Sequence, residues 1–250
     1  MPSTFLITGC SRGLGLALAT ELSKKGHTVF ATARDDPAPP LNELIENSQG
    51  LVKYVKLDVE SRSSVEEAEA KVATLLGDKG LDVLINNAGV INWMSEGIDK
   101  MTDLDSMLHT NVTSAHVVTS TFLPLLKKGT EKKVANISTT VGSITTASKY
   151  SMMAVPAYKV SKAALNMLTV QYALNYAEEG FTFLAISPGW LRTDLGGSAA
   201  DLDVETGAKA TLEAIQSHGK EFNGKFVNIR VAGWEHSEGL NQYDGEICPW

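Results

Sequence analysis

Residues 4–15 read TFLITGCSRGLG, and this stretch indicates the fold. A short apolar run at 4–8 leads into a turn with glycines at positions 9, 13 and 15, and helical spacing of apolar residues begins near residue 14. Glycines let a backbone turn sharply and approach a phosphate group at the N-terminus of the next helix. The stretch therefore predicts a strand, a phosphate-binding turn and a helix, although a tight turn without a ligand would also use glycine.

The same alternation continues along the chain. Short runs rich in β-branched residues alternate with longer stretches of helical spacing, which is typical of stacked βαβ units. Most of the runs are apolar throughout, as expected for a parallel sheet covered on both faces. The predicted fold class is α/β, a doubly wound parallel sheet in a single domain, 1–250. We predict strands at 4–8, 28–33, 52–57, 81–85, 133–137, 182–187 and 225–229, and helices near 14–25, 41–47, 63–76, 104–127, 156–178 and 204–217.

The composition limits the class of partner. The chain has 250 residues, 43% hydrophobic and 20% charged, with a formal net charge of -7. Nucleic acid or an anionic membrane would be repelled by such a surface. Cys10 and Cys248 stand at opposite ends and are expected to be free thiols in a reducing compartment. No stretch approaches the roughly 20 apolar residues of a membrane span, and no signal peptide is recognised, so the expected location is cytoplasmic.

In a doubly wound sheet, ligands bind beyond the carboxyl ends of the strands. After the second predicted strand stands Arg34, where an NAD-preferring site would need a carboxylate for the ribose 2′-hydroxyl; the first carboxylate is Asp35. Arg34 and Arg12 are predicted to bind the 2′-phosphate of NADP by charge-assisted hydrogen bonds. Two solvated surface arginines are the alternative. Asp58 and the run NNAG at 86–89 follow the next two strands, near the expected adenine and ribose, or serve turn formation alone.

Tyr158 and Lys162 stand four residues apart at the start of the helix predicted at 156–178, so both side chains lie on one face. A nearby cation stabilises the phenolate and lowers the tyrosine pKa toward the working pH, so that it can exchange a proton with a carbonyl or alcohol oxygen. As a bare pattern, Tyr-x-x-x-Lys is common, and an exposed helical pair is the alternative.

Hydroxyl groups follow the fifth predicted strand, where residues 138–142 (the hydroxyl segment) read STTVG. Ser138 or Thr139 can donate a hydrogen bond to a substrate oxygen as negative charge develops, or can cap the loop. Asn111 lies inside the helix predicted at 104–127, where an amide can interrupt helical bonding and hold a water.

Taken together and in this order, these motifs resemble the classical short-chain dehydrogenase/reductase family. The resemblance covers nearly the whole chain, and the sequences ATAR (31–34), GSI (142–144) and YDGEICPW (243–250) are similar to its sniffer-like carbonyl reductase branch. It implies a Rossmann-type sheet of about seven strands, NADPH/NADP+ as cofactor, and hydride transfer to a ketone or aldehyde.

The resemblance also implies roles for individual residues. Tyr158 is expected to donate the proton, Lys162 to hold the nicotinamide ribose and Asn111 to support a water-linked proton relay. Most of the family has two serines where this chain has Ser138 and Thr139, so Thr139 is expected to supply the active hydroxyl, with Ser138 in reserve. The expected cofactor-binding residues are Gly9, Ser11, Arg12, Gly13, Leu14, Gly15, Arg34, Asp58, Val59, Asn87, Ala88, Gly89, Tyr158, Lys162, Pro188, Gly189 and Thr193.

The substrate is expected to be chosen by the variable segments 90–100, 143–155 and 190–203. The last of these (the substrate loop) contains small residues at 195–201 that favour a mobile flap; a simple surface loop is the alternative. Residues 148–153 (the inserted segment) lengthen the interval before Tyr158, and residues 230–250 form a C-terminal tail. No metal site is expected. Apolar pocket-lining residues, which core packing would explain equally well, are predicted to be Trp93, Met94, Met153 and Trp190.

The leading hypothesis is NADPH-dependent reduction of a small-molecule carbonyl. The alternatives are an NADP-dependent alcohol dehydrogenase running in the oxidative direction and a catalytically silent NADP(H)-sensing protein. Nothing in the sequence decides the oligomeric state, but the helices near 104–127 and 156–178 are the expected surfaces of any homo-oligomer.

Overall fold

The computed structural model describes residues 2–94 and 96–250, which fold around one sheet. All seven strands are parallel, in the order β3-β2-β1-β4-β5-β6-β7, so the direction of strand addition reverses between β1 and β4. The α/β doubly wound fold is confirmed, and every predicted strand ends within two residues of an observed end. The strands are β1 (Thr4–Ile7), β2 (Thr28–Ala33), β3 (Val52–Lys56), β4 (Val83–Asn86), β5 (Lys133–Ile137), β6 (Thr182–Ser187) and β7 (Lys225–Asn228).

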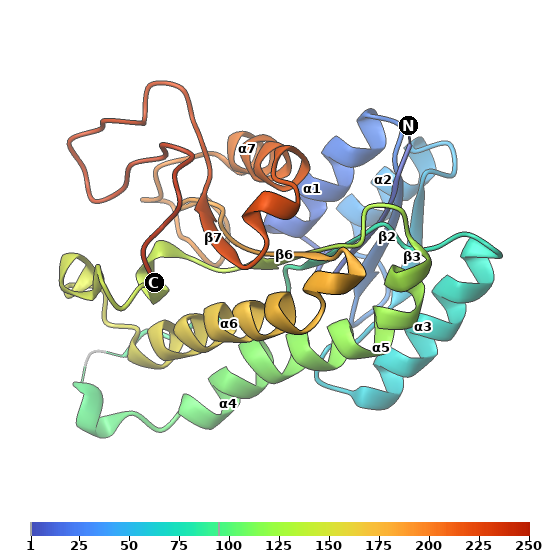
Figure 1. The fold of residues 1–250 in the computed structure, drawn as a ribbon. Coiled ribbons are helices and arrows are strands. Elements are labelled where there is room, and N and C mark those ends of the chain that lie inside the picture. Colours follow the sequence, from blue (N-terminus) through green and yellow to red (C-terminus); the bar gives the residue numbers. More distant parts are fainter. Residues whose placement is uncertain (1, 95) are drawn as a thin grey trace.

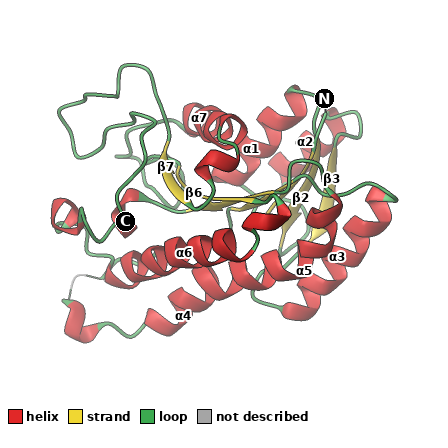
Figure 2. Ribbon diagram, viewed as in Figure 1, coloured by secondary structure: helices red, strands yellow, loops and turns green. Residues whose placement is uncertain are grey.

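Helices cover both faces of the sheet, with α1, α2 and α7 on one side and α3, α5 and α6 on the other (Figures 1 and 2). The chain follows right-handed βαβ units, which is the usual connection between parallel strands. The helices are α1 (Gly13–Lys24), α2 (Pro39–Asn47), α3 (Arg62–Leu76), α4 (Leu104–Leu108), α5 (Ser114–Lys128), α6 (Pro156–Asn175) and α7 (Val204–Ser217).

Two hydrophobic cores lie on the two faces of the sheet. Successive side chains of a strand point to opposite faces, so Phe5 and Ile7 of β1 enter the core under α1 and α7, whereas Leu6 enters the core under α3 and α5. The same division holds in β4, where Ile85 and Leu84 take opposite sides. This explains why the strands are apolar throughout and show no period-two pattern.

The long helix predicted at 104–127 is interrupted. A π-helical turn, His109–Thr113, separates α4 from α5 and contains Asn111. Such a turn leaves normal helical bonding incomplete, and π-turns are frequent at functional sites. The helix predicted at 41–47 begins two residues earlier, at Pro39, because proline suits the first turn of a helix.

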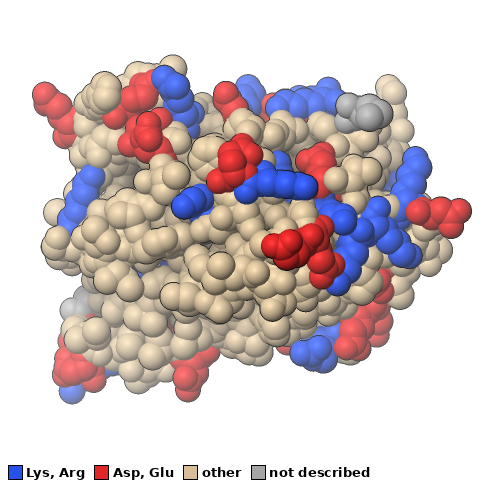
Figure 3. Space-filling view, viewed as in Figure 1, with Lys and Arg blue, Asp and Glu red and all other residues tan. Residues whose placement is uncertain are grey.

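One exposed surface is poor in charge. In the view of Figure 3 the area over α6 is largely uncharged, whereas acidic and basic side chains gather toward α3 and along the upper edge. Helix α6 exposes Val160, Met167 and Leu174, which follow one another at seven-residue intervals and so share one face. None of the helices in the described part of the chain combines the length and apolar character that a bilayer crossing requires.

Candidate active site

The glycine turn, residues 8–15, joins the end of β1 to the start of α1. Gly9 and Gly13 have positive φ values of 73° and 58°, which favour glycine. Gly15 is required for a different reason: a Cβ there would lie 2.3 Å from the carbonyl oxygen of Gly9 and 2.6 Å from Nδ2 of Asn87. The backbone therefore packs too closely at this turn for any larger residue.

The end of β4 holds the glycine turn in place. The Asn87 side chain donates hydrogen bonds from Nδ2 to the carbonyl oxygens of Thr8 at 2.8 Å and Gly9 at 3.2 Å. The Thr8 hydroxyl accepts in return from the backbone N–H groups of Asn87 and Ala88. The predicted cofactor residue Asn87 thus supports the turn itself, and its amide faces protein carbonyls.

The start of α1 fits a pyrophosphate. Arg12, the N-cap residue, provides no side-chain acceptor to the first N–H groups, and the first turn contains no acidic side chain. The N–H groups of a helix start, with its positive dipole end, form a favourable anion site. Thr193 lies beside it, because a Cβ on Gly13 would approach Thr193 Cγ2 to 3.5 Å. The residues present therefore fit the phosphates of a nicotinamide dinucleotide.

A cavity of about 530 Å³ opens beyond β2 and β3, where the adenosine end of a dinucleotide is expected. Arg34 lines it and contacts the Asp35 carboxylate at 3.5 Å. Arg12 does not line this cavity, and its Nε pairs with Asp194 of the substrate loop at 3.0 Å. Arg34 therefore borders the cavity, and the binding of a 2′-phosphate by Arg12 together with Arg34 stays a prediction. Its remaining lining residues are Asp35, Lys56, Asp58, Ser61, Ser63, Ser64 and Glu67.

Asp58 was predicted either to lie near the adenine and ribose or to serve turn formation alone, and its position is consistent with both. Its Oδ1 accepts a hydrogen bond from the Glu60 backbone at 3.0 Å, which is turn chemistry, and Ser61 rather than Asp58 caps α3. At the same time the residue borders the cavity next to Arg34.

Tyr158 and Lys162 are both buried, with 8% and 5% of their surface exposed, so they are not a solvated helical pair. Lys162 Nζ lies 5.6 Å from the centre of the Tyr158 ring and donates a hydrogen bond to the Ile137 carbonyl at 2.8 Å. It also lies near Gly89, because a Cβ on that glycine would be 3.6 Å from Nζ. Helix α6 thus brings the ammonium group between the ends of β4 and β5.

Burial sets the acidity of both groups. Desolvation raises the pKa of Tyr158 above its ordinary value of 10.0 and lowers the pKa of Lys162 to about 8. The sequence predicted the opposite direction for the tyrosine. The reason is that burial desolvates the phenol, while the Lys162 ammonium is directed at the Ile137 carbonyl. Tyr158, like an ordinary tyrosine, is a protonated phenol at neutral pH.

The hydroxyl segment separates the two predicted hydroxyl donors. Ser138 is 2% exposed and donates to Oδ1 of Asn166 at 2.6 Å, so its proton is directed into the core. Thr139 is half-buried, and its Oγ1 accepts from the Val141 backbone at 3.3 Å, which leaves its own proton available. Close packing holds the segment against α6: a Cβ on Gly142 would lie 2.7 Å from Cβ of Lys162.

Asn111 connects three parts of the site. Its Oδ1 accepts from the Val90 backbone at 2.8 Å, and its Nδ2 donates to the Val90 carbonyl at 2.9 Å and to Oγ of Ser161 at 3.0 Å. The interruption of the helix expected at this residue is present, and the side chain ties the turn after β4 to helix α6. The predicted water-linked relay remains a prediction.

The substrate loop begins after β6 and is fastened at its base. Leu191 and Leu202 form an isolated parallel bridge, and the Arg192 guanidinium donates to the carbonyls of Ala200 and Asp201. Gly189, before the loop, has a φ of 82° and packs against three apolar side chains. Trp190 at the start of the loop donates from Nε1 to the Gly196 carbonyl at 2.7 Å.

The predicted apolar pocket residues differ in exposure. Met153 packs against the buried cluster that contains Tyr158, and Met94 is half-buried, with its backbone N–H donating to the Ala154 carbonyl. Trp93 is 57% exposed. Their contact with a substrate remains a prediction.

Four side chains that sequence reasoning missed border this region: Tyr150, Asp201, Asn241 and Tyr243. Tyr150 and Tyr243 are 4% and 2% exposed, although both stand in polar loop sequence. Desolvation, with the hydrogen bond to Asp201, raises the pKa of Tyr243. A tyrosine inside an otherwise polar segment was the only signal of burial that the sequence offered. It did not indicate which residues the tyrosine contacts, because they are far away in the sequence.

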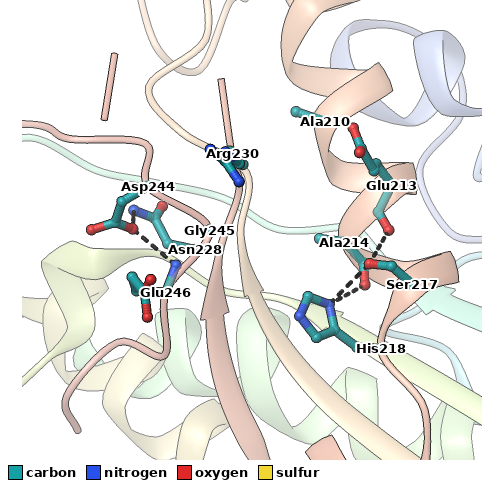
Figure 4. Close-up of a pocket in the computed structure, with 10 residues that line it drawn as sticks. All are labelled: Ala210, Glu213, Ala214, Ser217, His218, Asn228, Arg230, Asp244, Gly245 and Glu246. Atoms are coloured by element: carbon teal, nitrogen blue, oxygen red, sulfur yellow. Dashed lines mark hydrogen bonds between the residues drawn. The ribbon is translucent and has the colours of Figure 1, made fainter. Parts of the chain in front are cut away.

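A second cavity, of about 210 Å³, lies between α7, β7 and the C-terminal tail (Figure 4). None of the predicted site residues lines it, so we place the active site at the glycine turn and the carboxyl ends of the central strands. The lining residues are Ala210, Glu213, Ala214, Ser217, His218, Asn228, Arg230, Asp244, Gly245 and Glu246. Within residues 2–94 and 96–250, no three His, Cys, Asp or Glu side chains group to hold a metal.

A glycine turn at the reversal of strand order, next to a buried tyrosine and lysine, defines a nicotinamide-dependent oxidoreductase. The family model described as short chain dehydrogenase matches residues 3–203. An uncharacterised oxidoreductase of Schizosaccharomyces pombe is 34% identical over 265 residues, which cover 98% of this chain and 97% of that protein. The chain belongs to the short-chain dehydrogenase family, and it acts on carbonyl or hydroxyl groups.

Solved structures agree with this assignment. The NADPH-bound carbonyl reductase from chicken fatty liver is 30% identical, with a TM-score of 0.87 over 100% of this chain and 94% of that one. The carbonyl reductase Sniffer of Drosophila melanogaster is 28% identical, with a TM-score of 0.85 over 100% of both chains. The resemblance to the sniffer-like branch is thereby confirmed, as is a nicotinamide cofactor.

Proposed function

We propose that the protein reduces a ketone or aldehyde to the alcohol with NADPH, at the carboxyl ends of β4, β5 and β6. The observation that carries this proposal is the placement of the buried Tyr158 and Lys162 together at the start of α6, with Lys162 Nζ 5.6 Å from the centre of the Tyr158 ring. A tyrosine with its ordinary pKa of 10.0 is protonated at neutral pH, and desolvation raises the pKa of Tyr158 further, so the phenol has a proton to donate to a carbonyl oxygen. The family resemblance to two carbonyl reductases supports the same chemistry.

The hydride comes from the nicotinamide when that cofactor is bound, and the residues of this chain handle the oxygen. Thr139 donates a hydrogen bond to the carbonyl oxygen, since its hydroxyl proton has no partner within the loop. Tyr158 then transfers its phenolic proton to the same oxygen as negative charge develops. Ser138 does not take part, because its proton is bound to Asn166.

Lys162 and Asn111 complete the proposed site. A pKa of about 8 lets Lys162 carry its charge at neutral pH while remaining able to exchange a proton near that pH. We assign it to the nicotinamide ribose, next to Gly89, where its positive charge stabilises the phenolate that Tyr158 becomes on giving up its proton. Asn111 positions α6 and the turn after β4, and so keeps these groups in register.

The protonation state of the same tyrosine suits the reductive step. Oxidation of an alcohol needs a phenolate to accept the proton, whereas reduction needs the phenol. Tyrosine is protonated at neutral pH at its ordinary pKa, and burial raises the pKa of Tyr158 further, so the phenol is the form present. We expect alkaline pH and excess NADP+ to promote oxidation of the alcohol.

We also propose that Arg34 selects NADPH over NADH. It borders the cavity beyond β2, and a guanidinium binds a 2′-phosphate in a bidentate manner. In fluorescence titrations, Arg34→Ala is expected to weaken NADPH binding at least about tenfold and to leave NADH binding within about twofold. Arg230→Ala, far from this cavity, is the control. Equal affinity of the wild type for both nucleotides would refute the NADPH preference.

The activity is tested by incubating the protein with NADPH and a panel of aliphatic, aromatic and quinone carbonyls, following NADPH consumption. We expect turnover of at least one class and little turnover with NADH. Tight NADPH binding without consumption of NADPH by any carbonyl would instead favour a cofactor-sensing protein.

The uncharged face of α6 supports a homodimer. Val160, Met167 and Leu174 expose apolar side chains along one helical face, and we propose that α5 and α6 pair with the same helices of a second copy. Met167→Glu is expected to convert a dimer into a monomer in light scattering. A wild type that is monomeric at micromolar concentration would contradict this.

A further inference from the structure

Three segments far apart in the sequence meet beside the proposed carbonyl site. They are the inserted segment (148–153), the substrate loop (190–203) and the C-terminal tail (230–250). Their contact is made by side chains rather than by strand pairing: Tyr150, Asp201, Asn241 and Tyr243 form one connected group of hydrogen bonds.

Asp201 lies at the centre of this group. Its Oδ2 accepts a hydrogen bond from the Tyr243 hydroxyl at 2.5 Å and another from Nδ2 of Asn241 at 2.7 Å. Bonds to an ionised acceptor are shorter and stronger than neutral ones. One carboxylate oxygen of the substrate loop therefore binds two residues of the C-terminal tail.

The group reaches both the start of the substrate loop and the hydroxyl segment. The Tyr243 hydroxyl accepts from the backbone N–H of Trp190 at 3.1 Å, so the start of the substrate loop is fixed by the same tyrosine as its end. On the other side, the Tyr150 hydroxyl lies 3.1 Å from Oγ1 of Thr140 and 3.4 Å from Oδ1 of Asn241. Thr140 is the neighbour of Thr139, and a buried tyrosine of the inserted segment thus touches the hydroxyl segment.

The substrate loop also touches the cofactor side. Thr193 lies beside Gly13, and Asp194 pairs with Arg12 of the glycine turn. The ends of the loop are held by the buried Leu191 and Leu202, by the Arg192 guanidinium and by the bonds of Tyr243. Its middle, residues 196–199, is small and mostly exposed, so the attachments at the two ends set the position of the loop.

We propose that Asp201 is a positioning residue, whose carboxylate clasps the substrate loop to the C-terminal tail and so holds the carbonyl pocket in its closed shape. The role of this clasp in binding a carbonyl substrate rests on the proposed function, whereas the clasp between loop and tail does not depend on it. The tail and the inserted segment are thereby part of the substrate site, and sequence changes in either alter which carbonyl compounds bind.

Steady-state kinetics test the consequence for catalysis. Asp201→Ala is expected to raise KM for the carbonyl substrate about tenfold and to change kcat less than about threefold, because an open loop weakens ground-state and transition-state binding alike. Tyr243→Phe, which loses the bonds to both Asp201 and Trp190, is expected to act in the same direction. Asp201→Asn keeps an acceptor oxygen and should restore most of the wild-type KM. An unchanged KM in folded Asp201→Ala overturns the proposal.

The control is Asp82→Asn. Asp82 also accepts several hydrogen bonds, from Thr4 and Thr130, but it lies at the amino ends of the strands. The Asp82→Asn variant is expected to lower the melting temperature and leave KM unchanged, which separates loss of stability from loss of the clasp. A rise in KM equal to that of Asp201→Ala would show that the effect is general destabilisation.

A second measurement needs no activity. Arg192 is bonded through its backbone and its guanidinium to residues 200–202, so trypsin is expected to cut after Arg192 faster when the substrate loop opens, and mass spectrometry of the fragments identifies that cut. We expect Asp201→Ala and Tyr243→Phe to accelerate cleavage at Arg192 about tenfold relative to other sites, and Asp82→Asn to leave this ratio unchanged. If no carbonyl is reduced but Arg192 cleavage accelerates, the clasp stands and the proposed function fails. If cleavage at Arg192 is unchanged in a folded variant, the clasp is refuted.

Discussion

The two sides of the site are held together by different means. On the cofactor side, the glycine turn is shaped by backbone sterics at Gly15 and by bonds from Asn87 to backbone carbonyls. On the carbonyl side, the substrate loop and the C-terminal tail are joined by bonds between side chains, such as those of Tyr243 and Asn241 to Asp201, 42 and 40 residues apart in the sequence.

This difference separates the cofactor site, which many enzymes share, from the carbonyl pocket, which is specific to one enzyme. A backbone cradle tolerates almost no substitution, and it suits a cofactor shared by many enzymes. Side-chain contacts between loops can be exchanged one at a time without disturbing the sheet, so that the carbonyl pocket can change while the cofactor site stays the same. The variants below test first the cofactor side and then the carbonyl side of the site.

Gly15→Ala should disrupt the cofactor side most severely. Its Cβ would lie 2.3 Å from the Gly9 carbonyl oxygen, a backbone atom that cannot yield easily, and 2.6 Å from Nδ2 of Asn87, which is itself bonded to the turn. We expect NADPH affinity to fall more than about 100-fold, or the chain not to fold. Gly239→Ala, with open space around it, should be neutral in both calorimetry and NADPH titration. Normal NADPH binding by Gly15→Ala would mean that the turn does not contact the cofactor.

Thr139→Val should affect the carbonyl side alone. The hydroxyl is replaced by a methyl group of the same shape, so that kcat/KM for the carbonyl is expected to fall about 100-fold while NADPH binding is retained. Thr139→Ser keeps the hydroxyl and should stay within about threefold of the wild type. A stronger loss in Ser138→Ala than in Thr139→Val would assign the role to the other hydroxyl.

The pH profile of reduction should report Lys162. Its pKa of about 8 means that the ammonium is present below this pH and lost above it. Since Tyr158 stays protonated over the same range, kcat/KM should be constant near neutral pH and fall about tenfold per unit above pH 8. A profile that stays flat to pH 10 would show that the charge of Lys162 does not contribute.

Lys162→Met should abolish activity and increase stability. The folded pKa of Lys162 lies below its unfolded value of 10.5, so the cost of burying the charge is fully present below pH 8 and is relieved between pH 8 and 10.5. We expect urea unfolding at pH 7 to show a free energy of unfolding about 1–2 kcal/mol higher than that of the wild type. This figure already allows for the loss of the hydrogen bond to Ile137. The gain should shrink toward pH 10. A destabilised variant at pH 7 would contradict this balance.

The sequence allowed the fold and the cofactor side to be predicted because both depend on local patterns. Apolar runs become strands wherever both faces of a sheet are covered, and Gly9, Gly13 and Gly15 stand within one short turn. The resemblance to the family brought Tyr158 and Lys162 together across a helical turn, and burial in the structure explains why they are not an ordinary surface pair.

The carbonyl side could not be predicted in the same way. Nothing local to Tyr150 or Asp201 indicates that they reach the tail, because the loops meet only after the sheet has formed. The direction of the Tyr158 pKa was also wrong from sequence, since spacing places a cation nearby but does not reveal how completely both groups are desolvated. The pairing of Arg12 with Asp194 is likewise not indicated by sequence spacing, because the two residues come from loops far apart in the chain.

Tyr158→Phe is the measurement that tests the central claim most directly. The variant keeps the ring in its buried cluster and removes only the acidic hydroxyl. We expect kcat for NADPH-dependent carbonyl reduction to fall about 1000-fold or more, while NADPH affinity stays within about threefold of the wild type. Retained turnover in Tyr158→Phe, with NADPH bound normally, would show that another group protonates the carbonyl oxygen and that the proposed mechanism is wrong.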